Sequence, residues 1–160
     1  MTQSILFVCL GNICRSPTAE AVFTAKAMKA GHTDLMIDSA GTGAWHVGNP
    51  PDRRASAHAR KRGYDLSPLR ARAVDPTDFE KFDLILAMDQ QNLSDLKAMA
   101  PKNATAKIQL FLTYQHSSIR EVPDPYYGGD QGFEHVLDLI EAASDGLLDA
   151  LKKDTNNPRN

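Results

Sequence analysis

The sequence predicts an α/β fold: a doubly wound, four-stranded parallel sheet with helices on both faces. Short apolar runs alternate along the chain with longer helix-like segments, an order typical of parallel sheets. The apolar runs lack clear alternation, as expected for strands buried on both faces. The chain has 160 residues, 42% of them hydrophobic, which suits a single domain over 1–160 with a substantial core.

The first half of the chain contains two predicted strands and two predicted helices. The run that ends at Cys9 is continuously apolar, and Pro17 fits the first turn of a helix. Gly31 and Gly63 lie just past the two helices and mark their C-termini. The predicted elements are a strand at 4–9, a helix at 16–29, a strand at 35–39 and a helix at 54–62, the last preceded by a loop rich in glycine and proline.

The second half adds two strands and two helices. The run from Leu84 is continuously apolar, and Phe133, Val136, Leu137 and Ile140 recur at helical spacing. The final residues, 154–160, are polar and are expected to form a frayed tail. The predicted elements are a strand at 83–88, a helix at 92–99, a strand at 105–110 and a helix at 132–152.

Composition excludes several classes of protein. The net charge is −2, so no nucleic acid or membrane partner is expected. A leader and a long apolar segment are both lacking, which predicts a soluble, cytoplasmic protein. The two cysteines, Cys9 and Cys14, are too few for a disulfide framework and indicate a reducing compartment. Without a Cys-x-x-Cys pair or clustered histidines, we expect no metal and no cofactor.

The segment after the first strand carries the chemistry. Cys9 lies at the carboxyl end of that strand, where ligands bind in such folds, and Arg15 follows six positions later. The start of the next helix supplies unpaired N–H groups and a partial positive charge. Gly11 and Asn12 tolerate backbone angles denied to most residues. The sequence therefore predicts a cradle for a tetrahedral anion such as phosphate, formed by Leu10, Gly11, Asn12, Ile13, Cys14, Arg15 and Ser16.

Three residues provide the candidate catalytic groups. Arg15 and the helix terminus favour the thiolate form of Cys9, which is the nucleophilic form. The planar guanidinium of Arg15 matches two phosphoryl oxygens. Asp124 lies between two stiffening prolines and is the candidate general acid. Taken alone, Asp124 could equally be a turn residue, and Cys9 a buried structural thiol.

The segment from Val8 to Glu20 resembles the signature loop of the low-molecular-weight protein tyrosine phosphatases. The resemblance continues at 38–42, at 87–92 and at 122–127, and it spans almost the whole chain. It implies a metal-free phosphatase that forms a cysteinyl-phosphate, with Asp124 protonating the leaving group and then activating water. The implied substrates are phosphotyrosine-containing proteins, and inorganic phosphate or related oxyanions are the implied inhibitors.

Aromatic and polar residues complete the predicted site. Trp45, Tyr126 and Tyr127 are candidate walls for an aryl phosphate, or else they pack the surface loops. Asn12 is expected to hold the turn with Ser39 as its support, and Ser16 to donate to the thiolate or to cap the helix. By resemblance, Asp89 and Asn92 brace the Asp124 loop, although Asp89 equally fits a helix N-cap.

Leu69 departs from the family pattern, and Cys14 is a second cysteine in the predicted phosphate loop. Family members usually carry a histidine after the second helix, where this chain has Leu69, and this implies a differently tuned loop. Cys14 lies in the same loop as Cys9 and is a candidate redox partner that traps an oxidised Cys9 as a disulfide. A packed, inert thiol is the alternative.

Three other functions fit parts of the pattern. An arsenate reductase shares the fold but needs further cysteines. A phosphoarginine phosphatase typically carries threonine where Ile13 stands. A non-catalytic phosphotyrosine-binding module needs neither nucleophile nor acid. The sequence does not identify the physiological substrate.

Overall fold

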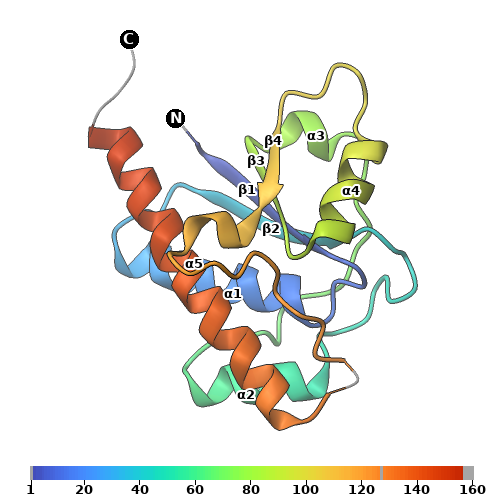
Figure 1. The fold of residues 1–160 in the computed structure, drawn as a ribbon, viewed down its shortest axis with the longest axis vertical. Coiled ribbons are helices and arrows are strands. Elements are labelled where there is room, and N and C mark those ends of the chain that lie inside the picture. The colour runs from blue at the N-terminus through green and yellow to red at the C-terminus, as the bar shows by residue number, and fades with distance from the viewer. Residues whose placement is uncertain (1, 127, 157–160) are drawn as a thin grey trace.

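The computed structural model describes residues 2–126 and 128–156, with side chains up to residue 153. Its sheet is four-stranded and parallel throughout, and its strands lie in the order β2-β1-β3-β4 (Figure 1). The fold class predicted from the sequence is confirmed. The strands are β1 (Ser4–Cys9), β2 (Met36–Gly41), β3 (Leu84–Ala87) and β4 (Lys107–Leu110).

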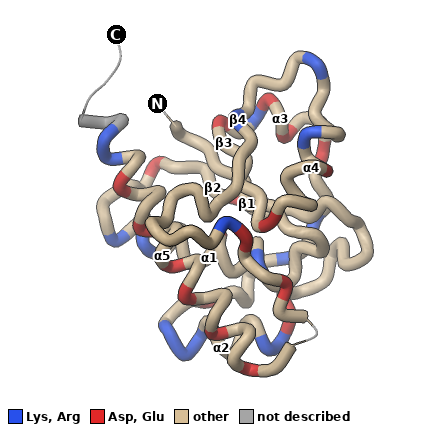
Figure 2. Tube along the Cα trace, viewed as in Figure 1, with Lys and Arg blue, Asp and Glu red and all other residues tan. Residues whose placement is uncertain are grey.

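Helices cover both faces of this sheet. One face packs against α1 (Arg15–Lys29) and α5 (Asp130–Asn156), and the other against α3 (Asp78–Lys81) and α4 (Gln90–Met99). The helix α2 (Arg53–Lys61) lies outside the sheet against α5 and α1 (Figure 1). Just after α2, Arg62 forms ion pairs with α5 through Glu134, Asp138 and Glu141, and Figure 2 shows basic residues around α2 beside acidic residues of α5.

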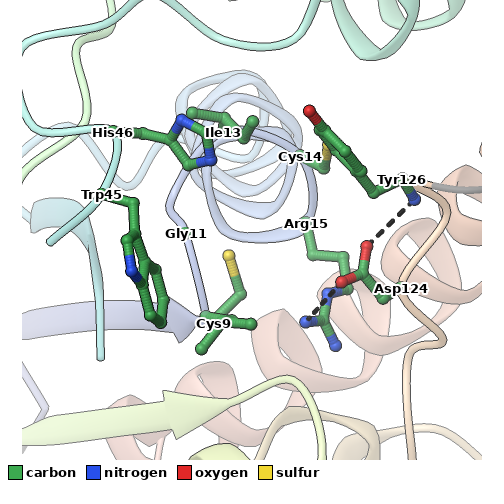
Figure 3. Close-up of a pocket in the computed structure, with 10 residues that line it drawn as sticks. Cys9, Gly11, Ile13, Cys14, Arg15, Trp45, His46, Asp124 and Tyr126 are labelled. Carbon is green, nitrogen blue, oxygen red and sulfur yellow. Dashed lines mark hydrogen bonds and ion pairs between the residues drawn. The ribbon is translucent and has the colours of Figure 1, made fainter. Parts of the chain in front are cut away.

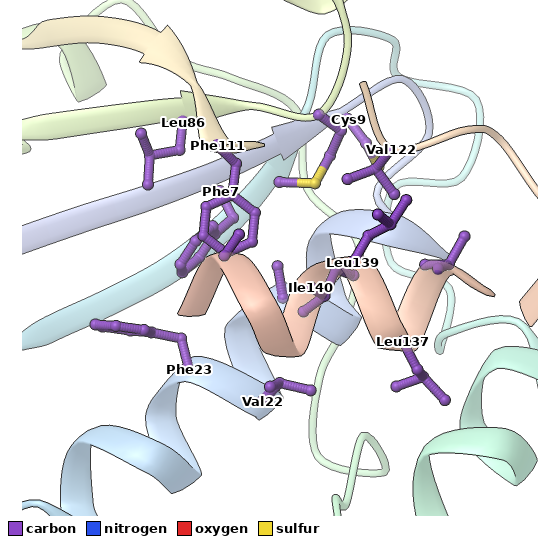
Figure 4. Packing of buried hydrophobic residues seen from close by; sticks show 14 of the residues in the cluster. Phe7, Cys9, Val22, Phe23, Leu86, Phe111, Val122, Leu137, Leu139 and Ile140 are labelled. Atoms are coloured by element: carbon purple, nitrogen blue, oxygen red, sulfur yellow. The ribbon is translucent and has the colours of Figure 1, made fainter. Parts of the chain in front are cut away.

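The central strand β1 is buried along its whole length because its side chains pack into a hydrophobic core on each face of the sheet. Ile5 and Phe7 belong to the core beneath α1 and α5, whereas Leu6 and Val8 belong to the core beneath α3 and α4. The ring of Phe7 lies 5.8 Å from that of Phe23 and 5.0 Å from that of Phe111 (Figure 4). Tight packing on both faces makes the end of β1 a rigid platform.

Several boundaries differ from the prediction. The helix α3 and the 3₁₀ helix η1 (Phe111–Tyr114) were not predicted, because four residues are too few to show a period. The helix α5 starts two residues earlier than predicted and runs to Asn156, so residues 154–156 are helical rather than frayed. The remaining predicted tail, 157–160, lies outside the described residues. None of the described helices is long and apolar enough to cross a membrane.

Candidate active site

The loop between β1 and α1 closes around the Cys9 sulfur. Cys9 is 3% exposed, and its Sγ accepts a hydrogen bond from the Asn12 N–H at 3.3 Å. The Ser16 hydroxyl lies 3.0 Å from the same sulfur. The Ser16 oxygen accepts from the Asn12 side chain at 2.7 Å, so its own hydrogen is left for one of two acceptors, the Cys9 sulfur or the Ala40 carbonyl at 3.4 Å. Two polar groups thus contact the sulfur from the loop and from the first turn of α1.

Ser16 does not cap the helix, contrary to one of the predicted roles. The helix α1 begins at Arg15, and its N-cap position is Cys14, without a side-chain cap. Ser16 therefore lies in the first turn, where its hydroxyl is turned back toward the strand end instead of toward the helix amides. The first turn of α1 is buried and surrounds the loop with backbone N–H groups that no helical carbonyl can satisfy.

Asn12 holds the turn of the loop. Its φ of 58° lies in the left-handed region, which is uncommon for a residue with a Cβ. The Asn12 side-chain amide donates to the hydroxyls of Ser16 (2.7 Å) and Ser39 (3.0 Å). Its carbonyl oxygen accepts from the backbone N–H of Arg72 at 3.0 Å. Three segments of the chain thus fix this one turn.

Gly11 serves the loop through its size and not through a left-handed backbone, which corrects the sequence-based expectation. Among the described residues, its φ is not among the positive values. A Cβ at Gly11 would lie 2.9 Å from the His46 ring. Glycine therefore lets His46 close over the loop.

The Ser39 hydroxyl donates in turn to a half-buried carboxyl group, that of Glu20, at 2.7 Å. Burial, together with the nearby charge of Asp38, raises the pKa of Glu20 to about 7. Leu69, at the position where the resemblance implied a histidine, packs half-buried against the core beneath α1 and α5 and not into this network. The hydrogen bonds of Ser39 and Asn12 are completed instead by the Glu20 carboxyl group and by the Arg72 backbone N–H.

The raised pKa of Glu20 predicts a pH-dependent stability. The folded protein binds the Glu20 proton more tightly than the unfolded chain does, because the pKa is about 7 in the fold and 4.5 otherwise. The contribution of Glu20 to stability is therefore largest at low pH, where it is protonated in both states, and it is lost as the pH rises through about 7. We expect the unfolding free energy of the parent to fall by about 2 kcal/mol relative to Glu20→Gln between pH 4.5 and pH 8. Urea titrations of both proteins across this range measure the difference, and a constant difference would contradict the assignment.

Arg15 is buried beneath the loop, and its side chain is 3% exposed. Its Nη1 donates to Asp89 at 2.7 Å and to the Val122 carbonyl at 3.0 Å. Its Nη2 lies 3.7 Å from a carboxylate oxygen of Asp124. Burial opposes the charge, but Cys9, Asp89 and Asp124 outweigh burial and raise the pKa of Arg15 further. The guanidinium stays charged and oriented.

Asp89 caps α4, which is one of its two predicted roles, and in the part of the chain that the structure describes its other contact is with Arg15 and not with the Asp124 loop itself. One oxygen caps α4 by accepting from the Asn92 N–H at 2.7 Å, and the other holds Arg15. Asn92 is buried, and within the described residues its side-chain oxygen makes no hydrogen bond to the Asp124 loop. That loop is instead anchored at Val122, whose N–H donates to Met88 and whose carbonyl accepts from Arg15.

Asp124 faces the Cys9 sulfur across a cavity of about 310 Å³. Figure 3 shows Trp45, His46 and Ile13 along one side of this cavity, and Asp124 and Tyr126 along the other. One carboxylate oxygen of Asp124 accepts from the Tyr126 N–H at 3.0 Å. The other is the oxygen near Arg15. The full lining is Cys9, Leu10, Gly11, Ile13, Cys14, Arg15, Trp45, His46, Asp124 and Tyr126.

The aromatic residues stand at the mouth. Trp45 is 72% exposed, and its ring lies against Gly43, where a Cβ would come within 1.9 Å of the ring. Tyr126 is 38% exposed, and Tyr127 lies outside the described residues. His46 was not identified from the sequence as a site residue. Its position beside Trp45 in a glycine-rich loop was the available signal.

Both cysteines of this site are unpaired thiols. Burial, with Asp52 and Cys9 adding to it, raises the pKa of Cys14, so Cys14 remains protonated. Among the residues that the structure describes, no cluster of three or more His, Cys, Asp or Glu side chains is arranged to hold a metal ion.

The fold and the site define an α/β protein whose cavity brings a cysteine, an arginine and an aspartate together at the end of its central strand. The family model for low molecular weight phosphotyrosine protein phosphatases matches residues 4–157. The chain belongs to this family, and it is an enzyme of the protein tyrosine phosphatase class.

Individual relatives and solved structures show how far the likeness extends. The low molecular weight phosphotyrosine protein phosphatase of Schizosaccharomyces pombe is 49% identical over 92% of this chain and 97% of its own. A protein tyrosine phosphatase from Entamoeba histolytica, crystallised with Hepes in its active site, superposes with a TM-score of 0.91 at 39% identity over 96% of this chain and 99% of its own. A Drosophila arginine phosphatase superposes with a TM-score of 0.89 at 34% identity over 95% and 98%.

Proposed function

We propose that this protein hydrolyses phosphotyrosine, and aryl phosphate monoesters generally, through a phosphocysteine intermediate on Cys9. One observation carries the proposal: the Cys9 sulfur, the Arg15 guanidinium and the Asp124 carboxyl group meet around one cavity. A nucleophile, an anion clamp and a proton donor are the three groups that this reaction needs.

In the first step, the Cys9 thiolate attacks phosphorus, the S–P bond forms and the P–O bond to the aryl group breaks. Asp124, protonated, gives its proton to the departing phenolate oxygen. Arg15 and the loop N–H groups hold the three other phosphoryl oxygens, whose charge they stabilise during transfer. The Ser16 hydroxyl, 3.0 Å from the sulfur, stays hydrogen-bonded at the floor.

In the second step, water attacks the phosphocysteine. Asp124, now a carboxylate, takes a proton from that water, the S–P bond breaks and phosphate leaves. The electron pair returns to sulfur, where the Ser16 hydroxyl and the Asn12 N–H stabilise the thiolate. None of these steps calls for a metal or another cofactor, so activity is expected to survive EDTA. Phosphate and similar oxyanions should compete for the empty loop.

The apolar and aromatic lining favours an aryl group over other phosphoryl carriers. Ile13, Trp45 and Tyr126 present flat or apolar surfaces to the cavity, which suit a phenyl ring. The likeness to a Drosophila arginine phosphatase makes phosphoarginine the second candidate. Paired peptides that differ only in phosphotyrosine or phosphoarginine decide between them by the ratio of their kcat/KM values.

Replacing Asp124 with asparagine tests its proton-transfer role. We expect kcat/KM for phenyl phosphate to fall about 10²–10³-fold, with a smaller fall for p-nitrophenyl phosphate, because p-nitrophenolate leaves without much protonation. Initial rates for both substrates across pH measure the effect. Equal losses for the two substrates would contradict a role in protonating the leaving group.

We also propose that peroxide inactivates the enzyme reversibly through a Cys9–Cys14 disulfide. Both thiols line the same cavity. Peroxide oxidises the Cys9 sulfur to a sulfenic acid, and the Cys14 sulfur then forms the S–S bond as its proton and the sulfenic hydroxyl leave together as water. After peroxide and then thiol, the parent should regain most of its own initial activity, and Cys14→Ser clearly less of its own. Equal recovery would remove the proposed role.

We propose a cytoplasmic location for the protein, because two free thiols suit a reducing compartment.

A further inference from the structure

The N-terminus of α2 stands between the phosphate loop and the loop that carries Asp124. The backbone N–H of Asp52, the N-cap residue, donates to the Ile13 carbonyl at 2.8 Å. Two residues later, Nη2 of Arg54 donates to the Tyr126 carbonyl, also at 2.8 Å. One helix end therefore contacts both halves of the site, although neither Asp52 nor Arg54 lines the cavity.

Arg54 contacts one carboxylate, one carbonyl and two aromatic rings, although its side chain is 42% exposed. Its Nε and Nη2 donate to the two oxygens of Asp52 at 3.3 and 3.2 Å. Its guanidinium carbon lies 5.5 Å from the Tyr126 ring centre and 4.9 Å from that of Phe133 at the start of α5. A planar guanidinium suits this position between two rings, whereas a lysine ammonium would not.

Asp52 is equally well fixed. Its carboxylate caps α2 by accepting from the N–H groups of Arg54 and Ala55. Burial disfavours its charge, but the hydrogen bonds from Arg54 and from these two amides outweigh burial and lower the pKa of Asp52. Arg54 therefore faces a permanent anion on a helix that Arg62 ties to α5 through three carboxylates.

Tyr126 connects Arg54 to Asp124, the proposed proton donor. The Arg54 guanidinium donates to the carbonyl of Tyr126 and lies over the Tyr126 ring. The backbone N–H of Tyr126 in turn donates to one oxygen of Asp124 at 3.0 Å. That contact turns the second oxygen toward Arg15. Prolines stiffen the backbone on both sides of Asp124, but its side chain is 43% exposed and needs an external brace.

From this chain of contacts we propose that Arg54 is a positioning residue for Asp124. It holds the backbone of Tyr126, and through it the carboxyl group, at the height at which a phenolate oxygen leaves. The inference rests on the proposed role of Asp124 as general acid and adds to it the residue that sets its geometry. Small displacements of a reacting group carry large kinetic effects, so loss of this brace should be visible in the rate.

The test compares leaving groups. We expect Arg54→Met, which keeps the length of the side chain, to lower kcat/KM for phenyl phosphate about tenfold, and for p-nitrophenyl phosphate no more than about two- to threefold. Arg54→Lys should resemble Arg54→Met, because an ammonium cannot hold Asp52, the Tyr126 carbonyl and both rings together. Arg53→Met is the matched control: it removes an exposed arginine from the adjacent position of α2 and should leave both rates unchanged.

Two comparisons make the outcome decisive. Arg54→Met added to Asp124→Asn should cost nothing further, because the group being positioned is already gone. Asp52→Asn keeps a capping side chain but removes the charge, and it should shift the ratio of the two substrates in the same direction even if the Arg54 variants fold poorly.

Equal losses for both substrates, no loss, or additive losses in the double variant would overturn the inference while leaving the proposed function intact. If Asp124→Asn itself showed no preference between leaving groups, the proposed acid role would fail, and the inference would fall with it. Melting temperatures of all variants separate these outcomes from a general loss of folded protein.

Discussion

Replacing Cys9 with serine is expected to abolish turnover while leaving the cavity able to bind phosphate. A serine hydroxyl is not ionised near neutral pH and cannot replace a thiolate as nucleophile. The donors around it, the Asn12 N–H and the Arg15 guanidinium, are unaffected. The rate of p-nitrophenyl phosphate hydrolysis should fall by at least about 10⁴-fold, and calorimetric titration with phosphate should still show binding.

Two outcomes would contradict this expectation for Cys9. Turnover within tenfold of the parent would mean that the nucleophile is another group. Loss of both turnover and phosphate binding, in a variant that melts at the parent temperature, would mean that the sulfur only shapes the loop. The substitution changes a single atom at the end of a well-packed strand that is buried on both faces. We therefore expect the fold to stay intact.

Arg15→Lys is expected to cost about 10²–10⁴-fold in kcat. Arg15 already divides its donors between Asp89, the Val122 carbonyl and the open cavity. A lysine ammonium has one nitrogen and cannot keep these contacts while also binding two phosphoryl oxygens. The Asp124 loop, which Arg15 holds through Val122, should loosen as well.

Steady-state rates and phosphate inhibition measure this loss together. We expect the inhibition constant for phosphate to rise along with the fall in kcat, since the same fork binds the product. Arg53→Lys, an exposed change on α2, provides the matched control. A lysine variant that keeps a third or more of the parent kcat would show that charge alone suffices at this position.

The parts of the site that lie close together in sequence were predictable, whereas of the distant segments only some residues, such as Asp124 and Ser39, were assigned to the site from the sequence. Cys9, Asn12, Arg15 and Ser16 share one loop, so their meeting follows from a strand, a turn and a helix. Glu20 meets Ser39, and the Arg72 amide meets Asn12, only because of tertiary packing. The role of Arg54 likewise depends on how α2 docks, which local pattern does not encode.

The fold shows the same division. The strands β1 and β3 were recognisable because each is a continuous apolar run, and β1 lacks alternation because it is buried on both faces. The four-residue helices α3 and η1 are too short for a periodic signal. The capping role expected of Ser16 was wrong because its hydroxyl bonds within the loop, a choice that only the folded arrangement decides.

The absence of the usual family histidine has a structural answer here. Leu69 packs toward the core, while the Asn12–Ser39 pair is completed by Glu20 and by a backbone amide. The loop is therefore not short of hydrogen-bond partners. Family membership over residues 4–157 also favours a phosphatase over the arsenate reductase and binding-module alternatives. The proposed role of Asp124, which lines the same cavity as Cys9, is one that neither alternative needs.

The most direct test of the account is to trap the intermediate. The enzyme is mixed with ³²P-labelled phosphotyrosine peptide in the presence of EDTA, quenched within milliseconds and digested, and the labelled fragment is mapped. We predict label on Cys9 that decays as phosphate is released, and none in Cys9→Ser. Label on another residue, or turnover without any labelled enzyme, would contradict the proposed mechanism.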